Sequence, residues 1–216
     1  MKVLLVDDHA VVRQGYASLL RALLPDVQLR EACDGEQALQ RVQEEIPNLV
    51  VMDIGLPGIS GLETTRRLRQ RLPQLRILFF SMHDELPLVR QALDVGAIGY
   101  LTKNSSPEVL VEAVKRTAAG HAYIEQQLAT QLACNPTSSD GLDPRLRELT
   151  QREFEIFVML ARGLPPRQIA EKLCISAKTV SNYQTLVKNK LQIASQAELV
   201  HLAIDSGVVR VGLESA

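Results

Sequence analysis

Residues 49–61 read Leu-Val-Val-Met-Asp-Ile-Gly-Leu-Pro-Gly-Ile-Ser-Gly, an unbroken apolar run that ends at Asp53 and passes into turn-forming residues. A short apolar run without alternation is typical of a strand buried on both faces, as in a parallel sheet covered by helices. Pro57 marks a break between elements. We therefore predict a buried strand at Leu49–Met52, with the carboxylate of Asp53 at its carboxyl end.

Similar apolar runs recur through the first 120 residues, separated by stretches whose apolar residues are three or four positions apart. The other runs are Val3–Val6, Val27–Leu29, Ile77–Phe80 and Ile98–Leu101. Five strand candidates alternate with five helix candidates, which predicts βαβ units. We expect an α/β domain with a five-stranded parallel sheet.

A segment rich in proline, glycine and short polar residues, at about 133–148, separates this region from a purely helical one. In the helical region Gly163 suits a helix stop, Pro166 the first turn of a second helix and Ser176 the N-cap of a third. Cys174-Ile175-Ser176 is expected to form the tight turn between the second and third helices.

The predicted organisation is a first domain at residues 1–122, a linker at 123–147 and a small all-α domain at 148–216. The total of 216 residues agrees with two small domains. Val3–Val6 is too short for a signal peptide or a membrane span, so a cytoplasmic protein without membrane contact is expected. Three cysteines far apart predict neither a disulfide framework nor a zinc site. The absence of tryptophan argues against a base-stacking surface for single strands.

The net charge of −1 conceals a division between the two halves of the chain. Residues 1–143 contain 14 basic and 18 acidic residues, a net charge of −4. Residues 144–216 contain 10 basic and 7 acidic residues, a net charge of +3. A near-neutral total is therefore compatible with a nucleic-acid partner for the second half.

Polar side chains stand where the predicted strands stop. Asp7 and Asp8 end the first strand, Asp53 the third and Ser81 the fourth, while Lys103 follows the fifth. Because ligands of an open parallel sheet bind beyond its carboxyl ends, these groups should converge at one edge. Clustered carboxylates repel one another and suit Mg²⁺, which prefers oxygen ligands. A carboxylate beside Mg²⁺ can attack phosphorus, and Lys103 and Ser81 can bind the phosphoryl oxygens.

The same residues resemble the receiver domain of two-component response regulators. The matching segments are Val-Asp7-Asp8-His9, Asp53-Ile-Gly-Leu-Pro57-Gly58-Ile-Ser-Gly61, Ser81-Met-His-Asp and Gly99-Tyr100-Leu-Thr-Lys103. The resemblance implies a flavodoxin-like fold with Asp53 as the phosphoacceptor. It also implies that Asp8, Asp53 and the carbonyl of Gly55 ligate Mg²⁺, with Asp7 acting through water. Ser81 and Tyr100 match the pair of side chains that reorients on phosphorylation.

The helical region has the pattern of a helix-turn-helix with a basic face. No acidic residue occurs from Lys172 to Ala197, whereas Lys172, Lys178, Lys188 and Lys190 are basic. Lys178 and Thr179 stand at a predicted helix N-terminus, which suits DNA phosphates. A solvated lysine face is the simpler interpretation of these residues alone.

The longer pattern resembles a LuxR-type DNA-binding domain and, with the receiver pattern, the NarL/FixJ subfamily. It comprises Leu149-Thr150-Gln-Arg-Glu153, Ile169-Ala170-Glu171-Lys-Leu173, Ile175-Ser176, Lys178-Thr179-Val180 and Lys190-Leu191. The resemblance makes residues 177–191 the recognition helix. Lys178, Thr179 and Lys190 would then contact the DNA backbone, and Ser181, Asn182 and Thr185 the base edges. Lys188 is a further predicted DNA-binding residue. Asparagine can pair with adenine through two hydrogen bonds, which favours Asn182 as a base contact.

Three departures from the family pattern concern the DNA-binding region, and one of them is Leu186, which stands where a polar residue is frequent. Pro165 stands where a capping serine is usual and offers no capping side chain, a loss of about 1 kcal/mol. Tyr183 replaces the usual histidine, although its hydroxyl can still donate to a phosphate.

These patterns predict a phosphorylation-controlled, DNA-binding transcription regulator rather than an enzyme. Its expected partners are a sensor histidine kinase, promoter DNA, a second copy of the chain when phosphorylated and RNA polymerase. An aspartyl-phosphate hydrolase would need a carboxylate two residues after Asp53, where Gly55 stands. A nucleotide-binding enzyme would need a glycine-rich loop after the first strand. A ligand-gated LuxR-type regulator and a regulator that acts without phosphorylation remain as alternatives.

Overall fold

The computed structural model describes residues 1–134, 143, 145–146, 149–173 and 175–209. The chain divides into two compact units, residues 1–135 and 136–216, which are considered separately below. No helix among the described residues is long and apolar enough to cross a membrane.

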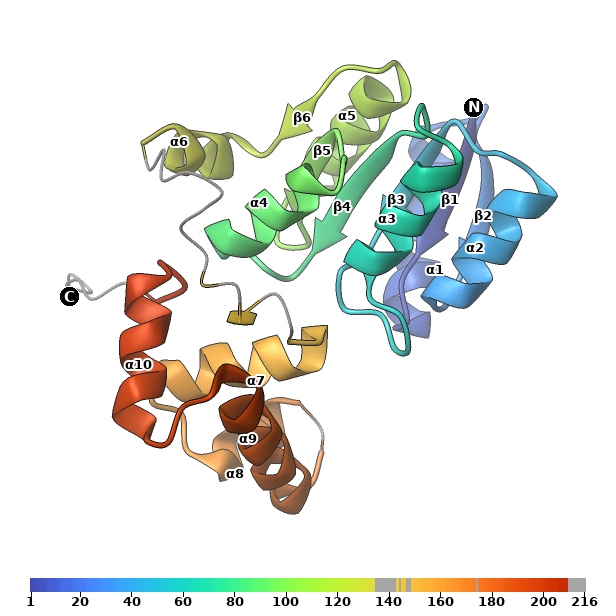
Figure 1. Cartoon of the computed structure of the whole chain (residues 1–216). Helices are drawn as coiled ribbons and strands as arrows, with labels where there is room; N and C mark the ends of the chain where they lie inside the picture. The colour runs from blue at the N-terminus through green and yellow to red at the C-terminus, as the bar shows by residue number, and fades with distance from the viewer. Residues whose placement is uncertain (135–142, 144, 147–148, 174, 210–216) are drawn as a thin grey trace. The chain divides into compact units, whose positions relative to one another are not determined.

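The first unit is a parallel sheet with helices on both faces (Figure 1). Its strands are β1 (Lys2–Val6), β2 (Gln28–Ala32), β3 (Leu49–Met52), β4 (Ile77–Ser81), β5 (Gly99–Thr102) and β6 (Tyr123–Ile124). Its helices are α1 (Ala10–Leu23), α2 (Gly35–Glu44), α3 (Gly61–Arg71), α4 (Leu86–Asp94), α5 (Pro107–Ala118) and α6 (Gln126–Cys134). The strand order is β2-β1-β3-β4-β5-β6, and every neighbouring pair is parallel.

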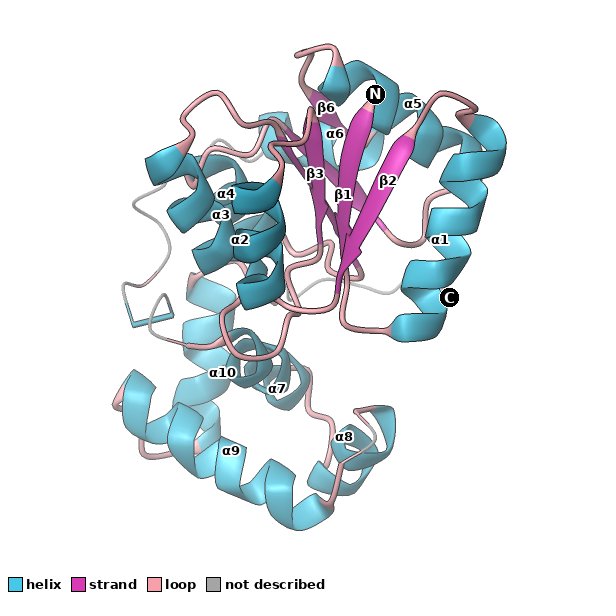
Figure 2. Ribbon diagram, turned by 90° about the vertical axis from the view of Figure 1, so that its right-hand side faces the viewer, coloured by secondary structure: helices cyan, strands magenta, loops and turns pink. Residues whose placement is uncertain are grey.

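Two apolar cores, one on each face of the sheet, explain why the strands lack polar alternation. Along β1, Leu4 and Val6 belong to one core, whereas Val3 and Leu5 belong to the other. The first core also receives side chains of α2, α3, α4 and α6, and the second those of α1 and α5. Figure 2 shows α2, α3 and α4 on one side of the sheet and α1 and α5 on the other.

All five predicted strands are present, and the structure adds a sixth, β6. β6 is two residues long and pairs with β5 through Gly99–Tyr123 and Tyr100–Ile124. A strand this short leaves no apolar run from which to predict it.

The predicted linker at 123–147 also begins too early. β6 and α6 occupy its first part, and Leu128 of α6 is buried in the core beside α4. Burying Leu128 stabilises α6 on the sheet, so the first unit extends beyond residue 122. Most of the proline- and serine-rich part, residues 135–142, lies outside the described residues.

The second unit contains the four predicted helices. They are α7 (Gln151–Ala161), α8 (Pro166–Lys172), α9 (Ala177–Leu191) and α10 (Gln196–Asp205). Ser176 caps α9 by accepting from the Thr179 N–H, and Gly163 ends the α7 segment at a φ of +80°. Pro165 precedes α8 without a side-chain cap, as expected. The predicted turn includes Cys174, which lies outside the described residues.

We expect the two buried threonines of α3 to contribute oppositely to stability. The Thr64 hydroxyl donates to the Ser60 carbonyl at 2.8 Å, whereas the buried Thr65 hydroxyl has no hydrogen-bond partner within the described part of the chain. Thr65→Val should therefore raise the free energy of unfolding by about 1 kcal/mol, and Thr64→Val should lower it by about 1 kcal/mol. Urea denaturation followed by tyrosine fluorescence measures both changes, and a loss of stability in Thr65→Val would contradict the assignment.

Candidate functional site: an acidic cluster at the sheet edge and an exposed helix face

The carboxyl ends of β1 and β3 place Asp7 and Asp53 side by side at one sheet edge. The Asp53 N–H donates to the Val6 carbonyl at 2.9 Å, and the Asp7 N–H donates to the Ala32 carbonyl at 3.2 Å. Only 2% of Asp7 and 5% of Asp53 is exposed. Backbone hydrogen bonds therefore hold two largely desolvated carboxylates next to each other.

Lys103 bridges these two carboxylates. Its Nζ lies 2.6 Å from Asp53 Oδ2 and 2.7 Å from Asp7 Oδ2, and its side chain is 6% exposed. Burial lowers the pKa of Lys103, but the charges and hydrogen bonds of Asp53 and Asp7 outweigh burial and leave the pKa raised. The ammonium group is therefore retained at neutral pH between the two carboxylates.

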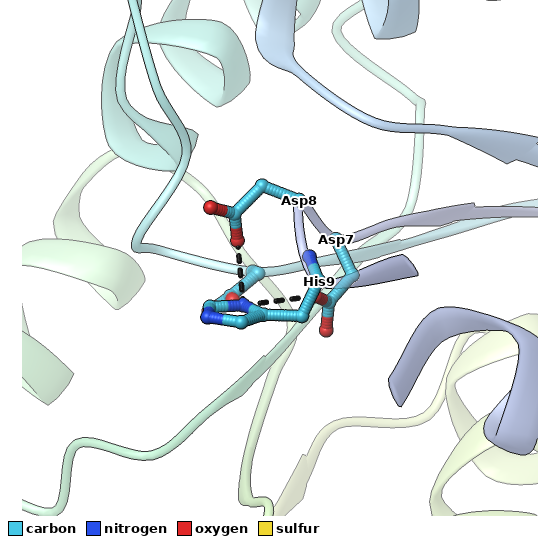
Figure 3. Close-up of side chains that lie close together, drawn as sticks. Asp7, Asp8 and His9 are labelled. Carbon is cyan, nitrogen blue, oxygen red and sulfur yellow. Dashed lines mark hydrogen bonds and ion pairs between the residues drawn. The ribbon is translucent and has the colours of Figure 1, made fainter. Parts of the chain in front are cut away.

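Asp8 and His9 complete the acidic cluster, which we define as Asp7, Asp8, His9 and Asp53. One ligand atom from each residue can be chosen so that all four lie within 4.8 Å of one another. His9 Nδ1 lies 2.8 Å from Asp8 Oδ1 and 3.5 Å from Asp7 Oδ1 (Figure 3). Burial raises the pKa of Asp8, and the neighbouring Asp53 and Asp7 carboxylates add to the rise while His9 opposes it.

The donor set of the acidic cluster fits a hard divalent cation. Asp8 Oδ1 is buried and accepts no hydrogen bond from the described residues, although it lies close to His9. The three carboxylates face one ammonium group, so negative charge is in excess. A small cation that prefers oxygen ligands, such as Mg²⁺, would relieve this excess.

The loop after β3 lies close to the start of α3, and this fixes the position of Asp53. A Cβ atom on Gly61 would stand 2.0 Å from the Asp53 carbonyl oxygen, so glycine is required there. The Gly61 N–H donates to the Ile54 carbonyl at 3.1 Å, and the Gly55 N–H donates to Asp53 Oδ1 at 3.3 Å. The predicted role of Gly55 in holding a metal stays a prediction.

Ser81 and Tyr100 lie on neighbouring strands and share His83 as a partner. The Ser81 Oγ accepts from the His83 N–H at 3.4 Å, and the Tyr100 hydroxyl donates to the His83 carbonyl at 2.8 Å. The Tyr100 ring is fully buried beside Phe79. Burial raises the pKa of Tyr100 well above its usual value of 10, and the Ser81 hydroxyl opposes this rise only in part.

Three residues around this edge were not identified from the sequence. Arg13 Nη1 donates to the Asp7 carbonyl at 2.5 Å, and the Tyr16 hydroxyl donates to the Lys103 carbonyl at 3.3 Å. Glu125 accepts from the N–H and the hydroxyl of Thr102. Arg13 lies only six residues from Asp7, whereas Tyr16 and Glu125 contact residues far away in sequence.

In the second unit, α9 presents one polar face and one apolar face. Val180, Val187 and Leu191 are buried. Lys178, Ser181, Asn182 and Thr185 are exposed, while Thr179, Tyr183 and Lys188 are half-buried. The hydroxyls of Ser181 and Thr185 donate to carbonyls one turn earlier in α9, at 3.1 Å each. We call these seven polar residues the α9 polar face; they are seven of the eight residues predicted to contact DNA.

Lys190 has a structural position that the sequence did not predict. Its Nζ lies 2.7 Å from Oε2 of Glu153 on α7, and Glu153 is 5% exposed. Glu153 also forms a capping box with Thr150 at the start of α7. Lys190 therefore holds α9 against α7, and its predicted contact with the DNA backbone stays a prediction.

Comparison with known families identifies both units. The model of the response regulator receiver domain matches residues 3–115, and the model of bacterial regulatory proteins of the luxR family matches residues 147–203. The chain belongs to the LuxR-type response regulators. It is a DNA-binding transcription regulator with a receiver domain, as the sequence patterns predicted.

Two relatives align with almost the whole chain. The response regulator is 65% identical to the transcriptional activator protein ExaE of Pseudomonas putida over 212 residues, which cover 98% of this chain and 99% of the relative. It is 36% identical to the response regulator GacA of Pseudomonas aeruginosa over 209 residues, covering 97% and 98%.

Solved structures show the same architecture. A LuxR-family two-component response regulator from Aurantimonas matches with a TM-score of 0.59 and 39% identity, covering 61% of this chain and 94% of that one. The response regulator RcsB in complex with DNA matches with a TM-score of 0.60 and 21% identity, covering 95% and 98%. The RcsB match supports the fold alone.

We expect the Glu153–Lys190 ion pair to make the second unit sensitive to acid. Burial raises the pKa of Glu153, but Lys190 and Thr150 outweigh it, so the pKa lies below its usual 4.5. Because the pKa is lower in the folded state, this stabilisation is present above pH 4.5 and is lost as pH falls further. Glu153→Gln should lower the unfolding free energy by about 1 kcal/mol at pH 7 and reduce its fall between pH 5 and pH 3.

The matched control for this prediction is Glu198→Gln. Glu198 holds the same position in the cap of α10 with Ser195, but it is exposed. Its replacement should therefore lower stability much less than Glu153→Gln does. Amide exchange of α7 and α9 in the full chain, corrected for intrinsic rates, measures both variants. Equal effects of the two substitutions would show that neither the burial of Glu153 nor its ion pair with Lys190 stabilises the second unit.

Proposed function

We propose that Asp53 accepts a phosphoryl group from a sensor histidine kinase, and that this modification controls promoter binding by the second unit. The observation that supports Asp53 is its place in the site: it is buried, its backbone is fixed by β1 and Gly61, and its Oδ2 contacts Lys103. A carboxylate oxygen would attack phosphorus and form an aspartyl phosphate, while the phosphohistidine nitrogen of the kinase leaves.

Mg²⁺ is the cofactor we propose for this transfer, held by Asp8, Asp53 and Gly55 with help from Asp7. When bound, the ion neutralises charge on the phosphoryl oxygens. Lys103 supplies a second positive charge beside Asp53, and its short contact with Asp53 Oδ2 holds the ammonium group next to the reacting carboxylate. Ser81, at the end of β4, would donate its hydroxyl to a phosphoryl oxygen.

Phosphorylation would act through the end of β4 and the start of the following loop. The phosphoryl group adds a charge of about −1.5 to −2 and three acceptor oxygens beside Ser81 and Lys103. Movement of Ser81 toward them would alter its contact with the His83 N–H, and the His83 carbonyl also accepts from Tyr100. Ser81 and Tyr100 thereby act as one switch that biases two receiver conformations.

DNA binding is assigned to the α9 polar face. Lys178, Thr179, Tyr183 and Lys188 would contact phosphates, and Ser181, Asn182 and Thr185 base edges. The Asn182 side chain is exposed, so its amide can reach an adenine and pair with it through two hydrogen bonds. We further propose a cytoplasmic protein that binds DNA as a homodimer and there contacts RNA polymerase.

Replacing the phosphoacceptor should abolish modification of the chain. Wild-type protein incubated with acetyl phosphate and Mg²⁺ should gain the mass of one phosphoryl group, and Asp53→Asn should gain none, because an amide oxygen is a far weaker nucleophile. Intact-mass spectrometry measures the gain. Asp26→Asn, at an exposed carboxylate away from the cluster, serves as the control and should be modified normally. A phosphoryl group retained on Asp53→Asn would refute the assignment.

Two substitutions on α9 should weaken DNA binding in different ways. Lys178→Ala should lower affinity for all sequences and reduce the slope of log K against log salt concentration by about 1, because one phosphate fewer is neutralised. Asn182→Ala should cost about 1–3 kcal/mol at the cognate site and relax preference at one base pair. Fluorescence anisotropy titrations over a range of salt concentrations and base substitutions measure these effects.

The control for both DNA variants is Lys115→Ala, which removes an exposed positive charge from α5 of the receiver. It should leave affinity and salt dependence unchanged. Unaltered binding by both Lys178→Ala and Asn182→Ala would show that α9 is not the DNA-contacting helix.

A further inference from the structure

Glu125 forms an unusual set of hydrogen bonds with the end of β5. Its Oε2 accepts from the Thr102 N–H at 3.1 Å and from the Thr102 hydroxyl at 2.8 Å. Its own N–H donates to the Tyr100 carbonyl at 3.1 Å. Thr102 is 6% exposed, so these bonds are largely shielded from water. Glu125 is thereby attached to β5 by backbone and side chain together.

The reason for this arrangement lies in the geometry of the sheet. The Lys103 N–H donates to the Ser81 carbonyl on β4, so the preceding Thr102 N–H points to the opposite side of β5. On that side β6 ends at Ile124 and provides no carbonyl opposite Thr102. A buried N–H without a partner is costly, and the Glu125 carboxylate supplies the missing acceptor.

Thr102, which makes these hydrogen bonds, lies in the chain between Tyr100 of the proposed switch and Lys103. Thr102 directly precedes Lys103, whose ammonium contacts Asp53, and Tyr100 stands two residues before Thr102. The Lys103 backbone has two further anchors, the Ser81 carbonyl and the Tyr16 hydroxyl. The backbone of Thr102 and Lys103 is thus held by Ser81, Tyr16 and Glu125. Among these three residues, only Glu125 follows α5 in the chain.

Glu125 also begins α6. The Ala129 N–H donates to the Glu125 carbonyl at 2.9 Å, which starts the helix, and Leu128 anchors α6 in the core beside α4. The chain continues from α6 through residues 135–142 to the second unit. A displacement of the Lys103 backbone would therefore reach α6 through Thr102 and the side-chain and backbone hydrogen bonds of Glu125.

We propose that Glu125 is a positioning residue that links Lys103 to α6, so that phosphorylation of Asp53 is transmitted to the connecting segment through the Thr102–Glu125 hydrogen bonds. This inference rests on the proposed function of Asp53. It assigns a regulatory role to a residue that touches neither the phosphoryl group nor DNA.

The test compares Glu125→Ala with Glu125→Gln in the full chain. Glutamine keeps an oxygen that can accept both bonds from Thr102, whereas alanine removes the acceptor. Beryllofluoride with Mg²⁺ serves as a stable stand-in for the phosphoryl group. Amide exchange of residues 126–134 and DNA affinity are each measured with and without beryllofluoride.

In wild type and Glu125→Gln, beryllofluoride should change exchange in α6 and raise DNA affinity, with coupling of roughly 5–150-fold. In Glu125→Ala, Asp53 should still be modified by acetyl phosphate, and DNA affinity without beryllofluoride should equal that of wild type. The increase in affinity and the response of α6 should fall to a small fraction of the wild-type values. Glu112→Ala, at an exposed glutamate of α5, is the control and should behave as wild type.

The proposal is overturned if Glu125→Ala retains the full response, or if Glu125→Gln loses it as completely as Glu125→Ala. The first result would show that another path connects the site to α6, and the second that hydrogen bonding to Thr102 is not the cause. Failure of the proposed function is distinguishable, because wild-type protein would then not be modified at Asp53.

Discussion

Excess negative charge at the carboxyl edge of the sheet is the constraint on which the receiver unit depends. Asp7 and Asp53 are almost fully buried, and the single ammonium of Lys103 lies within 2.7 Å of an oxygen of each. One cation cannot balance the two carboxylates together with Asp8, so the site favours a divalent ion. The same ammonium would neutralise a phosphoryl group on Asp53. Phosphorylation of Asp53 would therefore redistribute charge contacts that already exist at the site.

The central residues of this site could be predicted from the sequence because each stands within two residues of the end of an apolar run. Asp7, Asp53, Ser81 and Lys103 stand at or just beyond strand ends, and parallel strands bring their carboxyl ends to one edge. No knowledge of side-chain packing is needed for that inference. The helix boundaries of the second unit were predictable for a similar reason, since Ser176 and Gly163 have strong local preferences at helix ends.

What the sequence did not reveal depends on pairing between distant residues. β6 is two residues long and exists because β5 offers it an edge. Glu125 has the local pattern of an ordinary surface glutamate, and its contact with Thr102 arises only after β6 aligns with β5. Lys190 likewise belongs to a basic stretch, but its partner Glu153 lies 37 residues earlier. The pattern of neighbouring residues in the sequence cannot distinguish such residues from ones that are exposed to solvent.

The Lys190–Glu153 ion pair also alters how the charge of the second unit acts on DNA. The net charge of +3 is modest, and Lys190 of α9 forms an ion pair with Glu153 inside the second unit. Lys178 and the half-buried Lys188 remain on the α9 polar face. Because non-specific affinity grows with the number of phosphates neutralised, one copy gains little from charge alone. Two copies would double these contacts and read two half-sites, so the charge distribution supports the proposed homodimer.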